Sequence, residues 1–340
     1  MNPGPLFKAI IFSCAMSVLA MPQNWPAATA PGEESQVPVP QTLIPQNHVP
    51  QNHVPQNQAP QTPAQELSIL PAPTPLPQNA NEYVRQAIEH EVAELDRDHT
   101  HWRYHLHRED EKNNVDRDVI ETSQGSLART LLLWGKPLTA EQRQKDEERM
   151  RKLVSDPEER TQRAKREKED DEKVRKMLRA ISQAFIFTYV GEESGLMRLS
   201  FVPNPHYDPP SLELRIFRSL AGKIWIDRAQ NRLARVEGTL FEDVNFGWGI
   251  LGRLYKGGTF MVEQQYIGEG HWEVVSEEVN MVGRAVLFKT ISRKQKQSLS
   301  NFRRMPDSIT LSQAYDLLQK ESGSVSASGE HATLQPQGKN

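Results

Sequence analysis

The chain has 340 residues with 41 basic and 44 acidic side chains, and its formal net charge is −3. This balance argues against a general nucleic-acid-binding protein, which would carry a basic excess on part of its surface. Of the 24 prolines, 16 fall between Pro3 and Pro77, so a long N-terminal region is unsuited to a packed core.

The N-terminus carries an export signal. Lys8 precedes a short apolar run, residues 9–20, that ends in small side chains. This order is typical of a secretory signal peptide, and the run is too short to span a bilayer comfortably. We therefore expect a cleaved signal over residues 1–20, a periplasmic location, and no stable transmembrane segment after cleavage. Cys14, the single cysteine, lies inside the signal, so the mature chain is predicted to have no disulfide.

Residues 21–80 form a proline- and glutamine-rich segment. The sequence Pro-Gln-Asn-His-Val occurs at residues 45–49 and again at 50–54. Proline at every fifth position blocks helices and central strands, and the segment lacks the apolar residues of a core. We expect a disordered linker that holds the folded part away from a surface.

The folded region is predicted to begin with one helix and three strands. An apolar stripe at helical spacing covers residues 81–96. Alternating apolar and polar residues then indicate strands at 100–107 and 115–122, and a third at 127–134.

Residues 139–184 are predicted to form a charged helical insertion. Thr139 with Gln142 makes a capping box, and Asp156 followed by Pro157 starts a second helix. Acidic and basic residues nearly cancel, which favours a solvated helix whose middle projects into water. Its C-terminal end becomes amphipathic and is expected to dock on the core.

The next hundred residues read as an antiparallel meander. Turn signals separate seven predicted strands, at 185–190, 196–202, 223–227, 233–241, 259–267, 271–279 and 285–291. A helix capped by Thr310 follows, and residues 323–340 are expected to be a disordered tail. The predicted unit is a single α+β domain over residues 81–322.

Two patterns of chemistry-bearing residues were considered. Residues 247–252 spell G-x-G-x-x-G, but the surrounding strands are antiparallel and no helix follows, so a dinucleotide site is not predicted. His101 and His105 lie on one face of the first strand and are candidate metal ligands, although further ligands are not identifiable. We expect no cofactor.

Apolar residues at alternate strand positions point to a ligand cavity. A wide curved sheet with few helices has more apolar surface than those helices can cover, which favours a cavity for an apolar ligand. The candidate lining residues are Trp102, Tyr104, Leu106, Phe201, Ile224, Ile226, Val236, Leu240, Phe260, Val262 and Phe288.

Residues 222–227 and 232–238 resemble the core hairpin of the periplasmic outer-membrane lipoprotein carrier superfamily, and residues 283–290 fit the same meander. Residues 82–318 are also similar to uncharacterised exported proteins of soil acidobacteria. The landmarks of that likeness are Gly135–Thr139, Asn204-Pro205, Pro209-Pro210 and Gly247–Gly252. The resemblance implies a half-barrel, a curved antiparallel sheet with helices on its concave side, and a role without catalysis. The charged helices and the proline-rich tail depart from the carrier pattern.

These observations lead to three hypotheses. The first is a periplasmic binding protein for a lipid, lipoprotein acyl chain or other apolar ligand, with a role in outer-membrane lipoprotein sorting. The second is a non-enzymatic envelope scaffold that binds other envelope proteins. The third is a metal-dependent hydrolase built on His101 and His105. A dry cavity in the structure would favour the binding protein, and a completely filled core would favour the scaffold. Metal-ligating side chains that converge from separate strands would favour the hydrolase.

Overall fold

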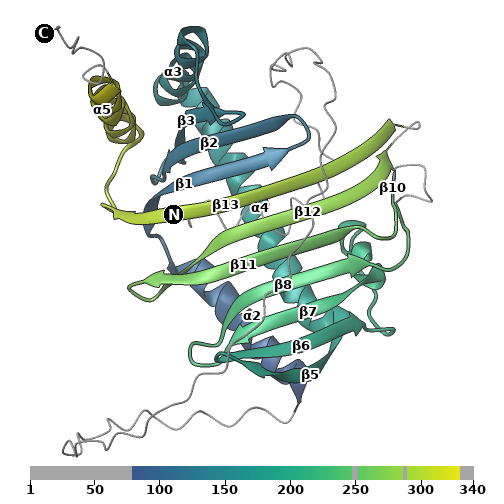
Figure 1. The fold of residues 1–340 in the computed structure, drawn as a ribbon. Helices are drawn as coiled ribbons and strands as arrows, with labels where there is room; N and C mark the ends of the chain where they lie inside the picture. Colours follow the sequence, from purple (N-terminus) through teal and green to yellow (C-terminus); the bar gives the residue numbers. More distant parts are fainter. Residues whose placement is uncertain (1–78, 247–251, 286–288, 330–340) are drawn as a thin grey trace, which may run out of the picture. The chain divides into compact units, whose positions relative to one another are not determined.

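The computed structural model describes residues 79–246, 252–285 and 289–329 (Figure 1). The predicted signal peptide, residues 21–78 of the predicted linker, Phe288 and residues 247–251 of the glycine motif lie outside these ranges, and Ala80 at the predicted end of the linker already belongs to a helix. Within them the chain forms an open antiparallel sheet of 13 strands together with helices, which confirms the predicted α+β class. No helix among the described residues is both long enough and apolar enough to cross a bilayer.

The helices begin where the sequence supplies caps. Asn79 accepts a hydrogen bond from the backbone N–H of Asn81, the capping box at Thr139 is formed, and Asp156 caps the helix that Pro157 begins. The helices are α2 (Ala80–Arg97), α3 (Ala140–Ser155), α4 (Pro157–Ala184), the 3₁₀ helix η1 (Glu213–Ser219) and α5 (Leu311–Gly329). α5 thus continues past the predicted domain end at residue 322, and proline does not interrupt the sequence there until Pro336.

The strands follow the chain in two meanders. They are β1 (His101–Asp110), β2 (Asn113–Ile120), β3 (Leu127–Leu133), β4 (Lys136–Pro137), β5 (Phe185–Glu193), β6 (Leu196–Pro203), β7 (Leu220–Asp227), β8 (Arg232–Leu240), β9 (Val244–Phe246), β10 (Gly252–Leu254), β11 (Thr259–Gly268), β12 (His271–Ala285) and β13 (Lys289–Met305). The order across the sheet is β4-β3-β2-β1-β13-β12-β11-β8-β7-β6-β5. Outside this order, β10 pairs with both β12 and β9. The last strand therefore joins the first meander to the second.

β13 is the element that sequence reasoning missed over most of its length. A strand was expected only to residue 291, whereas β13 runs to Met305. Gln295 and Gln297 are buried although their neighbours on both sides are polar as well. Polar residues on both faces hide the alternation that identifies a strand.

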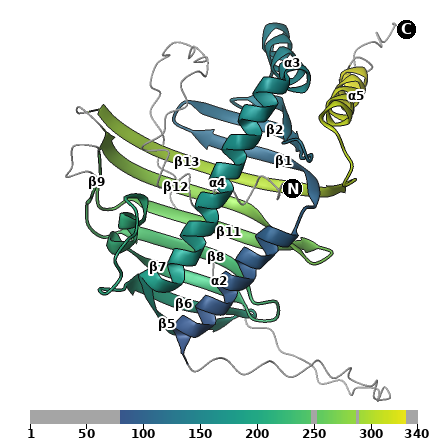
Figure 2. The ribbon, with the colours of Figure 1, turned by 180° about the vertical axis from the view of Figure 1, so that it is seen from behind.

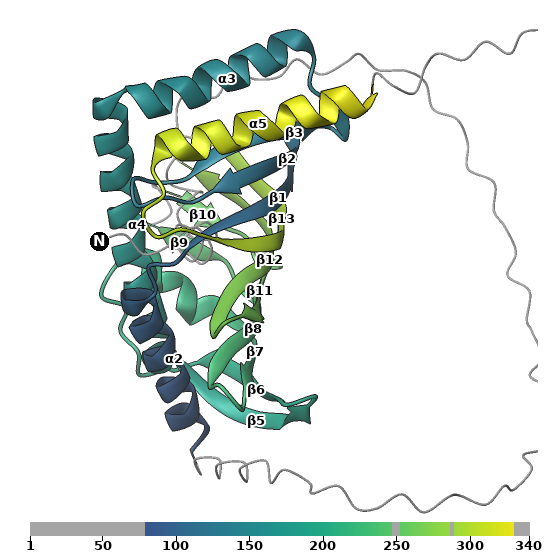
Figure 3. The same ribbon diagram turned by 90° about the vertical axis from the view of Figure 1, so that its left-hand side faces the viewer.

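Two helices cover one face of the sheet. Figure 2 shows α4 and α2 crossing the strands, and the side view in Figure 3 places both on the same side. α4 does not project into water as expected. Asp171 in its middle and Val174 are both buried, and its C-terminal half enters the main core together with α2.

A second, smaller core lies near β2 and β3. There α3 and α5 pack on the sheet through Ile120, Leu127, Met150, Leu153, Ile309, Leu311, Ala314 and Leu318. α3 also covers the edge of β3, because Asp146 accepts hydrogen bonds from the backbone N–H and the hydroxyl of Thr130, each at 2.9 Å. Arg149 donates to the carbonyl of Ala128. These contacts satisfy an edge that would otherwise be open to pairing.

Candidate ligand site under helix α4

The floor of the site begins with a cross-strand row of aromatic residues and glycines. From β5 to β11 the directly opposed residues are Phe187, Phe201, Gly222, Gly238 and Phe260. A Cβ atom on Gly222 would lie 2.8 Å from Phe201 Cζ, and one on Gly238 would lie 2.5 Å from Phe260 Cε1. A Cβ atom on Gly222 would also lie 2.0 Å from the backbone oxygen of Glu237, so Gly222 permits a close approach of the neighbouring backbone, whereas Gly238 makes room for the ring of Phe260.

The adjacent cross-strand row has aliphatic residues on four strands and a carboxylate on the fifth. Leu199, Ile224, Val236 and Val262 stand opposite one another on β6, β7, β8 and β11. The next residue in the row, on β12, is Glu277. This row is therefore apolar up to β11 and carries a carboxylate at β12, whereas Val274, Val279 and Met281 of β12 are buried apolar residues.

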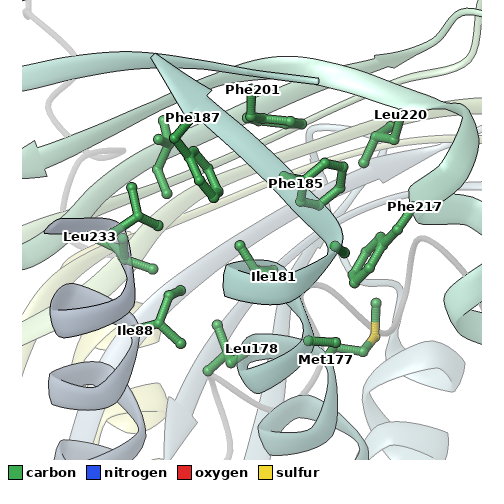
Figure 4. Packing of buried hydrophobic residues seen from close by; sticks show 14 of the residues in the cluster. Ile88, Met177, Leu178, Ile181, Phe185, Phe187, Phe201, Phe217, Leu220 and Leu233 are labelled. Atoms are coloured by element: carbon green, nitrogen blue, oxygen red, sulfur yellow. The ribbon is translucent and has the colours of Figure 1, made fainter. Parts of the chain in front are cut away.

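Helices close the apolar part from above. Figure 4 shows Leu178 and Ile181 of α4 and Ile88 of α2 facing the sheet, with Phe185 and Phe217 beside them. Phe185 follows α4 directly and lies with its ring centroid 4.7 Å from that of Phe201 and 5.1 Å from that of Phe217. Such tilted ring pairs add to the energy of burial.

An almost wholly apolar cavity remains between α4, η1 and the sheet. It is lined by Leu178, Ile181, Phe185, Phe187, Phe201, Phe217, Leu220, Ile224, Leu233, Ala234, Arg235, Val236, Phe260, Val262, Gln264 and Val274. Its volume is about 60 Å³. Engineered cavities that hold benzene are near 150 Å³, and drug-sized ligand pockets begin at about 300 Å³. The closed cavity therefore holds only a few methyl or methylene groups.

The predicted lining residues fall into three groups. Phe201, Ile224, Val236, Phe260 and Val262 line the cavity together. Ile226 and Leu240 are buried in the same core without lining the cavity. Trp102, Tyr104 and Leu106 belong to a separate cluster with Val119 and Leu299.

Sequence reasoning did not propose Leu178, Ile181, Phe185, Phe187 or Phe217 as lining residues. The amphipathic end of α4 was recognised, but the pairing of α4 with one part of the sheet requires the strand order. The alternation of Phe185 and Phe187 was the signal available for these two rings.

The polar end of the site contains buried oxygens without partners. Gln264 is 6% exposed and Glu277 is 1% exposed, and among the described residues neither Gln264 Oε1 nor either carboxylate oxygen of Glu277 has a hydrogen-bond partner. Burial raises the pKa of Glu277 to about 7, and Arg293 and Arg108 oppose that rise. Both arginines donate to Gln295 Oε1, at 2.8 and 2.9 Å.

A buried ion pair lies where α2 crosses the start of β8. Glu91 accepts hydrogen bonds from Arg232 Nε at 2.8 Å, from Arg232 Nη2 at 3.1 Å and from the backbone N–H of Leu233 at 2.8 Å. Both side chains are buried, and the carboxylate accepts three hydrogen bonds within the protein. This pair fixes α2 on the sheet.

A polar hollow of about 590 Å³ contains His101. In it His271 Nδ1 lies 2.8 Å from Asp98 Oδ2. Burial would raise the pKa of Asp98, but hydrogen bonds from Thr100 and His271 lower it below its usual range. Burial lowers the pKa of His101. Arg304 pairs with Glu269 here, so the charges in this hollow are largely compensated.

The two histidines considered as candidate metal ligands do not converge. His101 is buried at one end of β1, whereas His105 lies further along and its Nε2 is 3.3 Å from Asp116 Oδ1. Among the described residues, no three side chains of the metal-binding types are grouped as an ion would require. Gly252 of the glycine motif begins β10, which pairs antiparallel with β9 and β12.

The opposite face of the sheet is a charged surface. Lys223 lies 3.9 Å from Glu237, and Lys296 lies 2.5 Å from Glu278, across neighbouring strands. Exposed cross-strand pairs of this kind are typical of a solvated sheet face. The candidate site is therefore the helix-covered face, with its apolar cavity and polar end.

Comparison with known proteins gives one distant likeness. A protein-family model that matches this sequence was not found, and the search of curated proteins also gave no match. The crystal structure of a DUF1329 family protein from Desulfovibrio piger is similar over 67% of this chain and 94% of that chain, with 11% identity and a TM-score of 0.23. A likeness at this level supports no inference on function, which has to rest on the geometry of the site.

Proposed function

We propose that this protein is an exported, non-enzymatic binding protein for a lipid, a lipoprotein acyl chain or another apolar molecule. The observation that carries the proposal is the cavity under α4, whose wall is apolar except at Arg235 and Gln264. Sites for apolar ligands have this composition, with few polar groups that fix orientation. Each methylene group that enters such a space contributes about 0.8 kcal/mol.

The ligand requires more room than the closed cavity offers, and η1 is the wall best suited to move. Phe217 on η1 closes one side of the cavity. η1 is a short 3₁₀ helix, a form with weaker hydrogen-bond geometry than an α-helix. By contrast, α4 continues directly into β5 at Phe185 and is anchored there. We propose that the ligand enters when η1 shifts.

A second candidate function is an envelope scaffold with a filled core. The small volume of the cavity favours it, because a core with about 60 Å³ of free space is close to ordinary packing. The two functions differ in one measurable property, which is whether the protein takes up an apolar molecule at all.

The test is a titration with diphenylhexatriene, a hydrocarbon dye that fluoresces only in an apolar environment. Wild-type protein should bind the dye. A double variant, Val236→Ile with Val262→Ile, adds two methyl groups to the cavity wall and should weaken binding by about tenfold or more while keeping the melting temperature. Val202→Ile, on the exposed face of β6, is the matched control and should bind like the wild type. Wild-type protein that binds no dye would favour the scaffold.

Export is tested independently of binding. N-terminal sequencing of protein taken from the native cell envelope should start near Met21, after removal of residues 1–20. A protein that keeps Met1 and stays in the cytosol would contradict the proposed location.

A further inference from the structure

Two neighbouring strands of the sheet, β8 and β11, separate beside the apolar cavity. The pairing between them ends at Arg235 and Glu263. Beyond that point β8 still pairs with β7, and β11 still pairs with β12. The backbone N–H of Leu233 on β8 donates to Glu91 of α2 at 2.8 Å rather than to a residue of β11. The sheet is therefore parted at this end.

A hollow of about 430 Å³ lies where the two strands separate. Its lining includes three aromatic residues, Trp225, Tyr266 and Trp272, and the polar residues Arg235, Glu263 and Gln264. Ala234, Arg235 and Gln264 also line the closed cavity under α4. The hollow and the cavity thus share part of their walls, and the volume of the hollow is in the range of small-molecule sites.

The aromatic side of the hollow is open to a ligand. Tyr266 is 50% exposed, and its ring centroid lies 6.3 Å from that of Trp272. Trp272 is held in place by a hydrogen bond from its Nε1 to Gln230 Oε1 at 2.8 Å. A ligand with an apolar face would remove the exposed ring surface from water when it packs there.

The polar side of the hollow has a donor and an acceptor without partners. Gln264 is 6% exposed, and its Oε1 has no hydrogen-bond partner among the described residues. Arg235 Nε is also unpaired within the described part of the chain, although Arg235 Nη2 donates to Glu237 at 2.9 Å. Buried polar atoms in native proteins are nearly always satisfied. A ligand group that both donates and accepts hydrogen bonds would satisfy both atoms.

We propose that this hollow binds a pyranose sugar ring. One face of such a ring carries C–H groups that pack on an aromatic side chain, and its rim carries hydroxyl groups. Each hydroxyl both donates and accepts, so hydroxyls of one ring donate to Gln264 Oε1 and Glu263 and accept from Arg235 Nε.

The sugar either is free or is joined to a hydrocarbon chain. A ring that carries such a chain would fill the hollow and the cavity together, and this step alone rests on the proposed function. The sugar site itself does not depend on it, because its rings and polar groups lie in the hollow.

The first experiment compares two detergents that carry the same octyl chain. Their binding to the full-length protein is measured by calorimetry, below their critical micelle concentrations. Octyl glucoside has a sugar ring, whereas tetraethylene glycol octyl ether has a polyether with a single terminal hydroxyl. Wild-type protein should bind the glucoside about tenfold more tightly, because only the sugar offers several hydroxyls and a face to pack on the rings.

Two variants test whether the sugar lies in the hollow. Trp225→Leu with Tyr266→Leu removes two rings and should lower the preference for the glucoside below about threefold while the protein still binds diphenylhexatriene. Gln264→Leu removes the unpaired acceptor and should lower the preference to a similar extent. Trp134→Leu with Phe241→Leu is the matched control. It removes two rings that are 53% and 51% exposed outside the hollow and should keep the wild-type preference.

Methyl glucoside, which has the ring without the chain, separates the two sources of the sugar. Its binding, measured by saturation-transfer NMR and lost in the ring variant, would support the site even in a protein that takes up no dye, a result that overturns the proposed function alone. Equal binding of the two detergents without binding of methyl glucoside would overturn the sugar site, while dye binding would leave the proposed function standing. A preference for the glucoside that survives in both hollow variants would also overturn it.

Discussion

The helix-covered face of the sheet has two regions. Both consist of antiparallel strands, but the side chains that face the helices are apolar in one region and include polar residues in the other. In β5 to β8 and β11 the inward residues are phenylalanines, aliphatic residues and two glycines. In β12, β13 and β1 the same rows continue as Glu277, Gln297 and Arg108. The strands stay paired across the boundary, with a register shift between Glu263 and Gln264 on β11.

The two regions differ in how their buried side chains affect stability. In the apolar region the buried side chains are mainly hydrocarbon, and stability follows from the area removed from water. In the polar region Glu277 is buried without a hydrogen bond among the described residues, and Arg293 and Arg108 offset the cost of its burial only in part. An apolar residue at this position would continue the apolar row at a lower cost.

The largest effect is expected in the apolar region. Phe201→Ala removes a ring that contacts Phe185 and Phe187 and should lower the free energy of unfolding by about 3–5 kcal/mol. Val202→Ala, one position along on the exposed face, should change it by less than about 0.5 kcal/mol. Urea unfolding of both variants checks the assignment of faces. Equal effects would mean that Phe201 does not face the core.

The buried ion pair is the polar exception inside the apolar region. Glu91→Gln leaves the Arg232 guanidinium without its counter-charge and should cost about 3 kcal/mol. Glu89→Gln on the same helix breaks an exposed pair with Arg85 and should cost less than about 0.5 kcal/mol. Thermal unfolding of the two variants measures the difference. A small effect at Glu91 would show that water reaches the pair.

The polar region should make stability depend on pH. The pKa of Glu277 is raised from 4.5 to about 7, so the folded state holds its proton more tightly than the unfolded chain. The free energy of unfolding should therefore fall as the pH rises from about 4.5 to 7, by about 3 kcal/mol. Glu277→Gln should remove this contribution, and the difference between the two pH profiles isolates it from other groups. Parallel profiles would contradict the buried, unpaired state of Glu277.

The smallest effect concerns the edge near β3, outside both regions. Asp146→Ala removes the acceptor of the Thr130 backbone N–H and should cost about 1–2 kcal/mol. Faster amide hydrogen exchange at Thr130 would locate the loss. Unchanged exchange there would show that α3 protects this edge by burial rather than through the carboxylate.

The apolar region was largely predictable from sequence, because alternation identifies a strand when one face is apolar. Phe201, Ile224 and Val262 were placed together on this basis. The caps at Thr139 and Asp156 likewise gave the starts of α3 and α4. Alternation and capping patterns identified these elements correctly because both depend on residues that are close together in the sequence.

The polar region was not predictable, because alternation reveals a strand only when one of its faces is apolar. In β13 the buried positions Gln295 and Gln297 are polar and only the later Leu299 is buried and apolar among residues 292–305, so the alternation is too weak to detect the strand. The partners of Glu277 depend on strand order, which is a property of the whole chain. The oxygens at the end of the cavity therefore become visible only when β11 and β12 are paired.

The pairing of β1 with β13 has a consequence for the order in which the molecule assembles. β1 begins at His101, yet its partner ends at Met305, so the middle of the sheet joins residues about two hundred positions apart. Contacts of such high sequence separation form late and slowly. During synthesis β1 and β12 each keep an open edge until the last strand emerges. The central seam of the sheet therefore cannot close before nearly all of the chain has been made.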